Sequence, residues 1–221
     1  YEIGQQVADD PLVLVVDDFV SVDERQHVLD LASDRMEAAK VSRLGQNATS
    51  EKRTGSVGWI KHNETPIIRT IVKRVGDLVG LPVTHAESLQ VVHYGPSQQY
   101  KSHFDAWDPS TPKGKEKTRR GGNRLVTALI YLNEVEAGGA TGFPKLDVEV
   151  DAVPGRLCLF HDLVEGTSSR HPNSLHGGLP VEAGEKWACN LWFREHRYQQ
   201  SAGATSRTGG GRPAPKRKKR R

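Results

Sequence analysis

Cysteine and long apolar runs are both scarce in this chain of 221 residues. Its two cysteines, Cys158 and Cys189, are too few for the disulfide framework of a small secreted scaffold. No apolar run approaches the ~18 residues that a membrane-spanning helix needs. Hydrophobic residues make up 36% of the chain. Valine, leucine and isoleucine recur in compact runs, which predict a folded body with a substantial core.

Acidic residues are missing from the end of the chain. Residues 201–221 carry eight basic side chains and no acidic one, which leaves 23 basic against 27 acidic side chains in residues 1–200. The body is therefore acidic, which argues against a nucleic-acid-binding domain with basic residues on a folded face. We expect one domain over residues 1–200 and a disordered basic tail over residues 201–221. The tail is a solubilising segment, a nuclear address, or a contact for nucleic acid or an anionic surface.

The first 85 residues carry helix signals and predict a helical support for the rest of the domain. Ser21 and Glu24 form a capping-box pattern before a helical spacing of apolar residues. A second helix is predicted over residues 65–78, with Pro66 in its first turn. Ahead of both helices, the β-branched run 11–16 predicts a strand.

From residue 86 to about residue 197 the pattern changes to strands, which form the predicted core of the domain. Four segments are rich in aliphatic or aromatic residues and are separated by Gly, Pro, Asn and Asp: 89–94, 125–132, 156–160 and 187–194. Helices followed by many short strands indicate a β-sandwich or barrel with the helices packed outside. Cys158 and Cys189 lie on two of these strands, and we expect both to be small buried hydrophobes.

A polar segment, 108–122, interrupts the strands. It holds five basic residues between Lys113 and Arg120 and is predicted as a structureless loop. Loops of this length are usually functional or disordered. The segment is therefore either a solvated loop or a lid over a neighbouring site.

The first candidate metal ligands are His103 and Asp105, which lie just beyond a predicted strand. Side chains two positions apart in an extended segment project to the same side, so this imidazole and carboxylate can bind one ion. A third ligand must come from elsewhere, and His176, just before another strand, is the best candidate. Two histidines and one carboxylate are the ligand set of non-haem Fe(II), which leaves other coordination positions open.

The sequence contexts of other polar residues favour roles other than metal binding. His171 precedes a proline in a polar loop, where we expect a flexible surface role. His161 and Asp162 are adjacent on a strand, so their side chains point to opposite faces. Lys186 opens an apolar strand ten residues after His176. A lysine at the edge of a core usually extends into solvent, whereas one that points inward needs an anion, such as a dicarboxylate cosubstrate.

Five segments resemble the motifs of the prolyl 4-hydroxylases, which are Fe(II)- and 2-oxoglutarate-dependent dioxygenases. In chain order they are 52–59 (KRTGSVGW), 94–105 (YGPSQQYKSHFD), 124–144 (RLVTALIYLN followed by GGATGFP), 154–160 (PGRLCLF) and 174–194 (SLHGGLPV, GEKW and NLWFR). The similarity extends from about residue 13 to residue 197. One departure is Gly55, which stands between Thr54 and Ser56 where the family has Arg-Thr-Ser.

The resemblance implies a double-stranded β-helix, a jelly-roll or cupin-like fold that is mainly β with flanking α and carries its N-terminal helices outside. It also implies site roles. The expected Fe(II) ligands are His103, Asp105 and His176. The expected contacts of 2-oxoglutarate are Lys186, which pairs with its distal carboxylate, Tyr94 and Thr141. The expected residues of a peptide groove are Arg53, Tyr100 and Trp192, although Trp192 fits a core aromatic equally well.

The function implied is hydroxylation of proline in proline-rich peptide or protein segments, with O2 and 2-oxoglutarate as cosubstrates and ascorbate as reductant. Such segments adopt the extended polyproline II form that an open groove receives. The alternatives are a dioxygenase of the same fold that acts on another side chain or on nucleic acid, and a catalytically silent module that binds proline-rich partners. We expect a monomer. Asn-x-Thr triplets at Asn47 and Asn63 hint at the endoplasmic reticulum or secretory route, if an N-terminal segment is missing; otherwise the cytoplasm or nucleus is expected.

Overall fold

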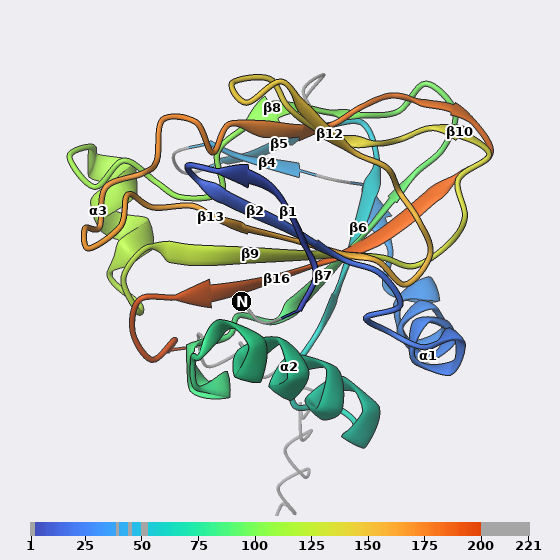
Figure 1. Cartoon of the computed structure of the whole chain (residues 1–221), viewed down its shortest axis with the longest axis horizontal. Coiled ribbons are helices and arrows are strands. Elements are labelled where there is room, and N and C mark those ends of the chain that lie inside the picture. Colours follow the sequence, from blue (N-terminus) through green and yellow to red (C-terminus); the bar gives the residue numbers. More distant parts are fainter. Residues whose placement is uncertain (1–2, 39, 44–45, 50–52, 200–221) are drawn as a thin grey trace, which may run out of the picture.

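Strands dominate the computed structural model (Figure 1). The structure describes residues 3–38, 40–43, 46–49 and 53–199, so the predicted basic tail, 201–221, lies outside the described residues. Within those residues, no helix is long and apolar enough to cross a membrane. The mainly β composition and the large antiparallel sheets agree with the predicted double-stranded β-helix.

The larger sheet has eight strands, and every pairing in it is antiparallel. In spatial order they are β1 (Gln5–Asp9), β2 (Leu12–Val16), β13 (Leu157–His161), β9 (Arg124–Tyr131), β16 (Lys186–Arg194), β7 (Leu89–Tyr94), β6 (Ser56–Ile60) and β3 (Glu37–Ala38). The five strands predicted from apolar runs are therefore β2, β7, β9, β13 and β16, which lie side by side in this sheet.

A four-stranded sheet packs over one face of the larger sheet. Its order is β12 (Val148–Val150), β11 (Thr141–Phe143), β14 (His176–Gly178) and β8 (Tyr100–His103). Two further pairs complete the β structure: β10 (Ala137–Gly138) with β15 (Val181–Ala183), and β4 (Lys40–Arg43) with β5 (Gln46–Thr49). These strands are too short to show a clear apolar pattern, which is why the sequence did not predict them.

Two helices, α1 (Val22–Ser33) and α2 (Pro66–Val79), pack on the other face of the larger sheet, with a short 3-10 turn over Val83–His85 after α2 (Figure 1). The capping box at the start of α1 is present: Glu24 N donates to Ser21 Oγ, and Ser21 N donates to Glu24 Oε2. Thr65 caps α2, and Pro66 occupies its first turn. Both helices begin within one residue of the predicted positions.

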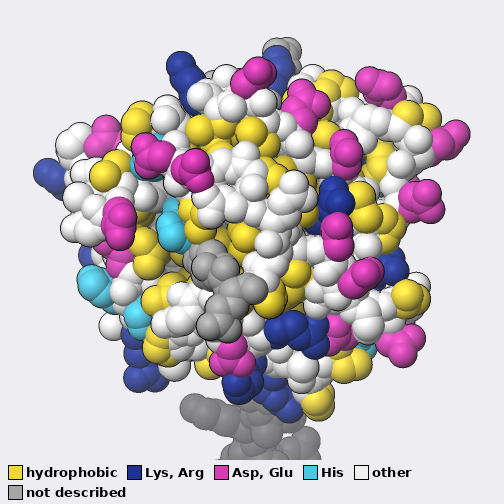
Figure 2. Space-filling model, in the orientation of Figure 1, with side chains coloured by type: hydrophobic (Ala, Val, Ile, Leu, Met, Phe, Trp, Pro, Cys, Tyr) yellow, Lys and Arg dark blue, Asp and Glu magenta, His cyan; other side chains and the backbone are white. Residues whose placement is uncertain are grey.

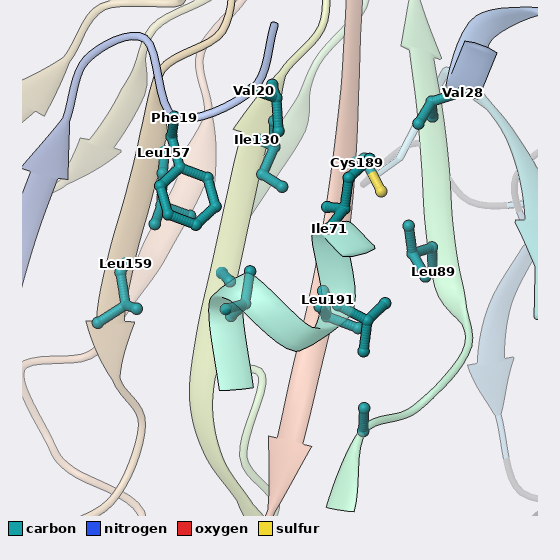
Figure 3. Close-up of a cluster of buried hydrophobic side chains, with 14 of the residues drawn as sticks. Phe19, Val20, Val28, Ile71, Leu89, Ile130, Leu157, Leu159, Cys189 and Leu191 are labelled. Atoms are coloured by element: carbon teal, nitrogen blue, oxygen red, sulfur yellow. The ribbon is translucent and has the colours of Figure 1, made fainter. Parts of the chain in front are cut away.

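The central strands are buried on both faces because each face has a different cover. On β9, Ala128 and Ile130 face the helices, whereas Leu129 and Tyr131 face the smaller sheet. Figure 3 shows the helix-side cluster, in which Ile71 of α2 lies over the strands. This two-sided burial explains why the strands read as continuous apolar runs. Cys158 and Cys189 are both buried free thiols, as predicted.

The prediction of a structureless 108–122 segment is wrong, because α3 (Pro112–Thr118) forms there. Thr111 Oγ1 accepts from Gly114 N at 3.0 Å and caps the helix, and Pro112 occupies the first turn. The expectation for His171 is also wrong. It is buried, and its Nε2 lies 2.9 Å from Asp10 Oδ1.

The helix-side cluster carries a first prediction, for stability. Ile71 is 1% exposed between α2 and the sheet, so Ile71→Ala removes buried methyl groups and leaves a cavity. We expect the free energy of unfolding to fall by about 3 kcal/mol, measured by urea denaturation. The neighbouring Thr70→Ala, at an exposed position of the same helix, is the control and is expected to change stability by less than about 1 kcal/mol. Equal losses for both variants would contradict this packing.

Candidate active site

The pairing of β8 with β14 brings the two predicted histidine ligands together. His103 and His176 are directly opposed in this ladder, and their ring centroids are 4.5 Å apart. Asp105 follows β8 by two residues, and its carboxylate oxygens lie 3.5 Å from His103 Nε2 and 3.6 Å from His176 Nε2. One ligand atom from each residue lies within 4.8 Å of the others. The structure therefore brings together the three residues chosen from the sequence.

Backbone carbonyls orient both imidazoles. His103 Nδ1 lies 3.0 Å from Lys101 O, and His176 Nδ1 lies 3.0 Å from Ser174 O. A ring that donates from Nδ1 to a carbonyl presents the lone pair of Nε2 to the metal. Burial, together with the neighbouring His103, lowers the pKa of His176 to about 4. The ring is therefore neutral at physiological pH, as a ligand must be.

Asp105 is buried and held by two donors. Thr127 Oγ1 lies 2.9 Å and Trp192 Nε1 2.7 Å from the same carboxylate oxygen, Oδ2. Burial alone would raise the pKa of Asp105, but His176 and His103 hold it well below its usual range. The carboxylate stays ionised, and its Oδ1 is left to serve as a single ligand atom.

A second buried carboxyl group stands behind Asp105. Thr127 Oγ1 also lies 2.7 Å from Asp162 Oδ2, yet a hydroxyl has only one proton to donate. Burial and the nearby Asp105 raise the pKa of Asp162 well above its usual range. A protonated Asp162 donates to Thr127, which then donates to Asp105. Within the described residues, the adjacent His161 does not join the metal cluster. The link from Asp162 through Thr127 to Asp105 was not predicted.

The Lys186 side chain points inward and is buried, with 3% of the residue exposed. Its Nζ donates to Gly139 O at 2.5 Å and lies 5.2 Å from the Tyr131 ring centroid. No carboxylate in the described part of the chain pairs with it. Burial lowers its pKa to about 8, so the amine is charged at neutral pH and lacks a counter-ion. An anionic ligand fits this position.

The predicted site residues line one cavity of about 720 Å³. They are His103, Asp105, His176, Lys186, Tyr94, Thr141, Arg53, Tyr100 and Trp192. A cavity of this size suits a small ligand together with part of a larger one. Tyr94 is buried and is paired with Lys186 in the β7–β16 register, whereas Thr141 Oγ1 accepts from Tyr131 at 2.8 Å.

Two of the groove candidates, Tyr100 and Arg53, contact each other. Tyr100 stacks on the His103 ring, with centroids 3.6 Å apart. The Arg53 guanidinium lies 4.6 Å from the Tyr100 ring centroid and donates to Gln90 Oε1 at 3.0 Å. Arg53 is 9% exposed, and its Nε has no hydrogen-bond partner among the described residues. Trp192 is buried, and its indole holds Asp105, so it orients a predicted ligand.

Arg124 was not predicted as a site residue, and it lies beside Trp192 and Asp105. Its guanidinium lies 3.5 Å from the Trp192 ring centroid, and its Nη1 is 3.8 Å from Asp105 Oδ1. Glu87 accepts from Arg124 Nε and from Arg194 Nε, each at 2.8 Å. One buried carboxylate therefore fixes two arginines near the metal cluster.

The donor set can be tested against a metal and a cosubstrate. Three converging neutral or anionic donors with free lone pairs fit Fe(II), whose sites commonly use two histidines and one carboxylate. The unpaired Lys186 ammonium in the same cavity fits a carboxylate of a bound acid. The residues present therefore fit both an iron ion and a dicarboxylate beside it.

Comparisons with known proteins agree with this geometry. The model of the 2OG-Fe(II) oxygenase superfamily matches residues 89–194, which include all three predicted ligands and Lys186. The crystal structure of a viral collagen prolyl hydroxylase from Paramecium bursaria Chlorella virus-1, in complex with 2-oxoglutarate, superposes with a TM-score of 0.67 at 27% identity. The match covers 85% of this chain and 98% of that one.

Sequence relatives cover most of the chain but differ in length. Prolyl 4-hydroxylase 5 of Arabidopsis thaliana is 31% identical over 210 residues, which are 86% of this chain and 70% of that protein. A relative from Acanthamoeba polyphaga mimivirus is 40% identical over 140 residues, which are 63% of this chain and 57% of the relative. The chain spans only 34% of prolyl 4-hydroxylase subunit alpha-3 of Rattus norvegicus.

Proposed function

Because the chain belongs to the prolyl 4-hydroxylase family of Fe(II)- and 2-oxoglutarate-dependent oxygenases, we propose that it hydroxylates carbon 4 of proline in proline-rich peptide segments. O2 and 2-oxoglutarate are the cosubstrates, and succinate and CO2 the coproducts. One observation carries the proposal: the two-histidine, one-carboxylate cluster and the unpaired Lys186 share a single cavity. A silent binding module has no need for four such groups to converge.

The residues divide the work between metal, cosubstrate and peptide. His103, Asp105 and His176 hold the iron, and Lys186 pairs with the distal carboxylate of 2-oxoglutarate. When bound, iron and 2-oxoglutarate supply the oxidising power that converts a C–H bond to C–OH. Thr127 holds Asp105 in orientation by donating a hydrogen bond to Oδ2. Tyr100, stacked on His103, places an aromatic wall where the peptide enters.

The test is direct turnover. The protein is incubated with Fe(II), 2-oxoglutarate, ascorbate and a polyproline peptide, and succinate and the peptide mass are measured. The expected result is a peptide heavier by one oxygen atom, with one succinate formed for each hydroxylation. Succinate formation that no proline peptide stimulates would reject proline as the substrate. Modification of another side chain or of nucleic acid would support the alternative dioxygenase activity.

Ascorbate as reductant is part of the same proposal. The expected result of omitting it is turnover that stops early and resumes when it is added, and full turnover without it would contradict the assignment. The monomeric state, the compartment and the role of the basic tail stay predictions from the sequence.

The buried lysine predicts a pH dependence of cosubstrate binding. The pKa of Lys186 is about 8 in the free protein, and only the charged amine attracts a carboxylate. Above this pKa, the Kd for 2-oxoglutarate is expected to rise about tenfold per pH unit. Calorimetry with Mn(II)-loaded protein from about pH 7 to about pH 9.5 measures the profile. Lys186→Arg keeps its charge over this range and is expected to show a flat profile. A flat profile for the unsubstituted protein would contradict the assignment.

A further inference from the structure

The outer wall of the active-site cavity carries more positive than negative charge. Apart from the metal cluster and Lys186, its charged lining residues are Arg53, Lys113, Lys117, Arg124, Arg170 and Asp108. Arg124 forms an ion pair with Glu87, which Arg194 shares. Asp108 Oδ1 accepts from Ser110 N at 2.9 Å and from Ser110 Oγ at 2.6 Å. Besides Arg124, the described lining of the cavity therefore includes four basic side chains and one acidic side chain, Asp108.

This excess is local, because the body of the protein is acidic. Residues 1–200 hold more acidic than basic side chains, and acidic side chains are spread over the face seen in Figure 2. Basic residues gathered at a cavity within an acidic body create a local positive potential, which attracts anionic ligands and raises their association rate.

The helix α3 presents two of these charges in a fixed position. Lys113 and Lys117 are four residues apart and so lie on one face of α3. Both are half-buried against the cavity, while Lys115 and Glu116 between them are exposed.

The position of α3 is set by packing and hydrogen bonds at both ends. A Cβ atom at Gly114 would lie 1.7 Å from Asp108 O, so only glycine allows this close approach. Arg194 Nη1 donates to Lys117 O at 2.9 Å and to Gly122 O at 2.8 Å. Arg194 is in turn held by Glu87, which connects the basic wall to the core of the site.

The other two charges flank the metal ligands. Arg170 stacks over the Phe104 ring at 3.9 Å, and Phe104 lies between His103 and Asp105 in the chain. Arg53 is buried, and its Nε is unpartnered at the opposite wall. These two positive charges therefore line the same cavity as the metal cluster.

We propose that the preferred substrate is an acidic proline-rich peptide, with aspartate or glutamate within a few residues of the target proline. This proposal rests on the proposed prolyl hydroxylase function and adds the charge of the sequence context. The complement lies in the cavity wall. Its lining includes Arg53, Arg170, Lys113 and Lys117, and a carboxylate beside the target proline would place negative charge near them.

The test compares three labelled peptides that differ only beside the target proline, with Glu, Gln or Lys. Their Kd values for the Mn(II)- and 2-oxoglutarate-loaded protein are measured by fluorescence anisotropy. We expect the Glu peptide to bind about tenfold more tightly than the Gln peptide, and the Lys peptide to bind more weakly than both. High salt is expected to reduce these differences. Equal Kd values for the three peptides would overturn the proposal.

Charge-reversal variants locate the effect on α3. In the double variant Lys113→Glu and Lys117→Glu, the preference for the Glu peptide is expected to disappear. Lys115→Glu, on the exposed side of the same helix, is the control and is expected to keep it; thermal unfolding of both variants verifies their fold. A preference that survives the double variant would overturn the role of α3. Single-stranded DNA that competes as strongly as the Glu peptide would favour a nucleic-acid ligand and reject the acidic peptide.

Because Kd is measured without turnover, failure of this proposal is distinct from failure of the prolyl hydroxylase function. Hydroxylation of all three peptides without a charge preference would support the prolyl hydroxylase function and reject the preference for an acidic sequence context. Tight binding of the Glu peptide without an increase in mass supports the charge preference and removes the prolyl reaction.

Discussion

Replacing His176 with alanine is expected to lower turnover about 1000-fold or more, because it removes one of three protein ligands from the iron site. The imidazole has no substitute in the described structure, since no other histidine, cysteine or carboxylate joins the cluster. Two measurements check the result: succinate formation with a polyproline peptide, and calorimetric titration with Mn(II). Both the metal affinity and the turnover are expected to fall together.

His171→Gln is the matched control for this experiment. His171 lies five positions before His176 and is also buried, but it pairs with Asp10 instead of the metal cluster. Glutamine keeps a polar side chain at that site, so Mn(II) binding is expected to stay within about twofold of the unsubstituted protein. Turnover that survives in His176→Ala, or metal binding lost equally in both variants, would reject the assignment.

Lys186→Met is expected to have two opposite effects. The Kd for 2-oxoglutarate rises about 100-fold or more, because a bound carboxylate would lose its buried partner. The free energy of unfolding of the cofactor-free protein rises by about 2 kcal/mol, because an apolar side chain replaces a buried, unpaired charge. Calorimetry and urea denaturation measure the two effects separately.

The sign of the stability effect follows from the direction of the pKa shift. Folding lowers the pKa of Lys186 from 10.5 to about 8, so between these values the unfolded chain binds more protons than the folded one. Stability of the unsubstituted protein therefore gains from this residue as pH rises through that window, and Lys186→Met lacks the gain. Lys145→Met, at an exposed position, is expected to change neither measurement. A destabilised Lys186→Met variant would show that the amine stabilises the empty site.

The three residues of the candidate metal cluster could be chosen from the sequence because the evidence for them is local. His103 and Asp105 are two positions apart, and His176 stands in its own short motif before a strand. The inward position of Lys186 was implied by the family resemblance. Lys186 also shares the strand alternation of Ala188 and Trp192, whose side chains line the same cavity. Residue spacing along one strand carries this information.

The supporting residues could not be predicted in the same way, because their roles depend on pairings between distant strands. Thr127 of β9 contacts Asp105, which is 22 positions away, and Asp162, which directly follows β13 and is 35 positions away. Thr127 lies opposite Trp192 in the β9–β16 register. Its only signal in the sequence was that it is a polar residue within an apolar strand, on the face that points to the site. His171 was misplaced because its partner, Asp10, lies 161 positions away.

The segment 108–122 was mispredicted for a different reason. It was predicted as a loop because it is polar, although Pro112 follows the capping residue Thr111, where proline favours a helix start. Gly114 is required for close packing on Asp108 and does not mark a turn. The same residue types thus have opposite meanings at a helix start and inside a loop.

Because β9 and β16 are buried on both faces, alternate residues of each strand have different roles. Those on one face stabilise the fold, and those on the other face include residues that line the cavity. On β16, Cys189, Leu191 and Phe193 belong to the helix-side core, whereas the alternate residues line the cavity. Substitutions that reshape the cavity can therefore accumulate on one face while the opposite face keeps the strand in place. Such an arrangement lets a family diversify its substrates on a constant scaffold, and it marks the cavity-facing positions as the ones to randomise in directed evolution.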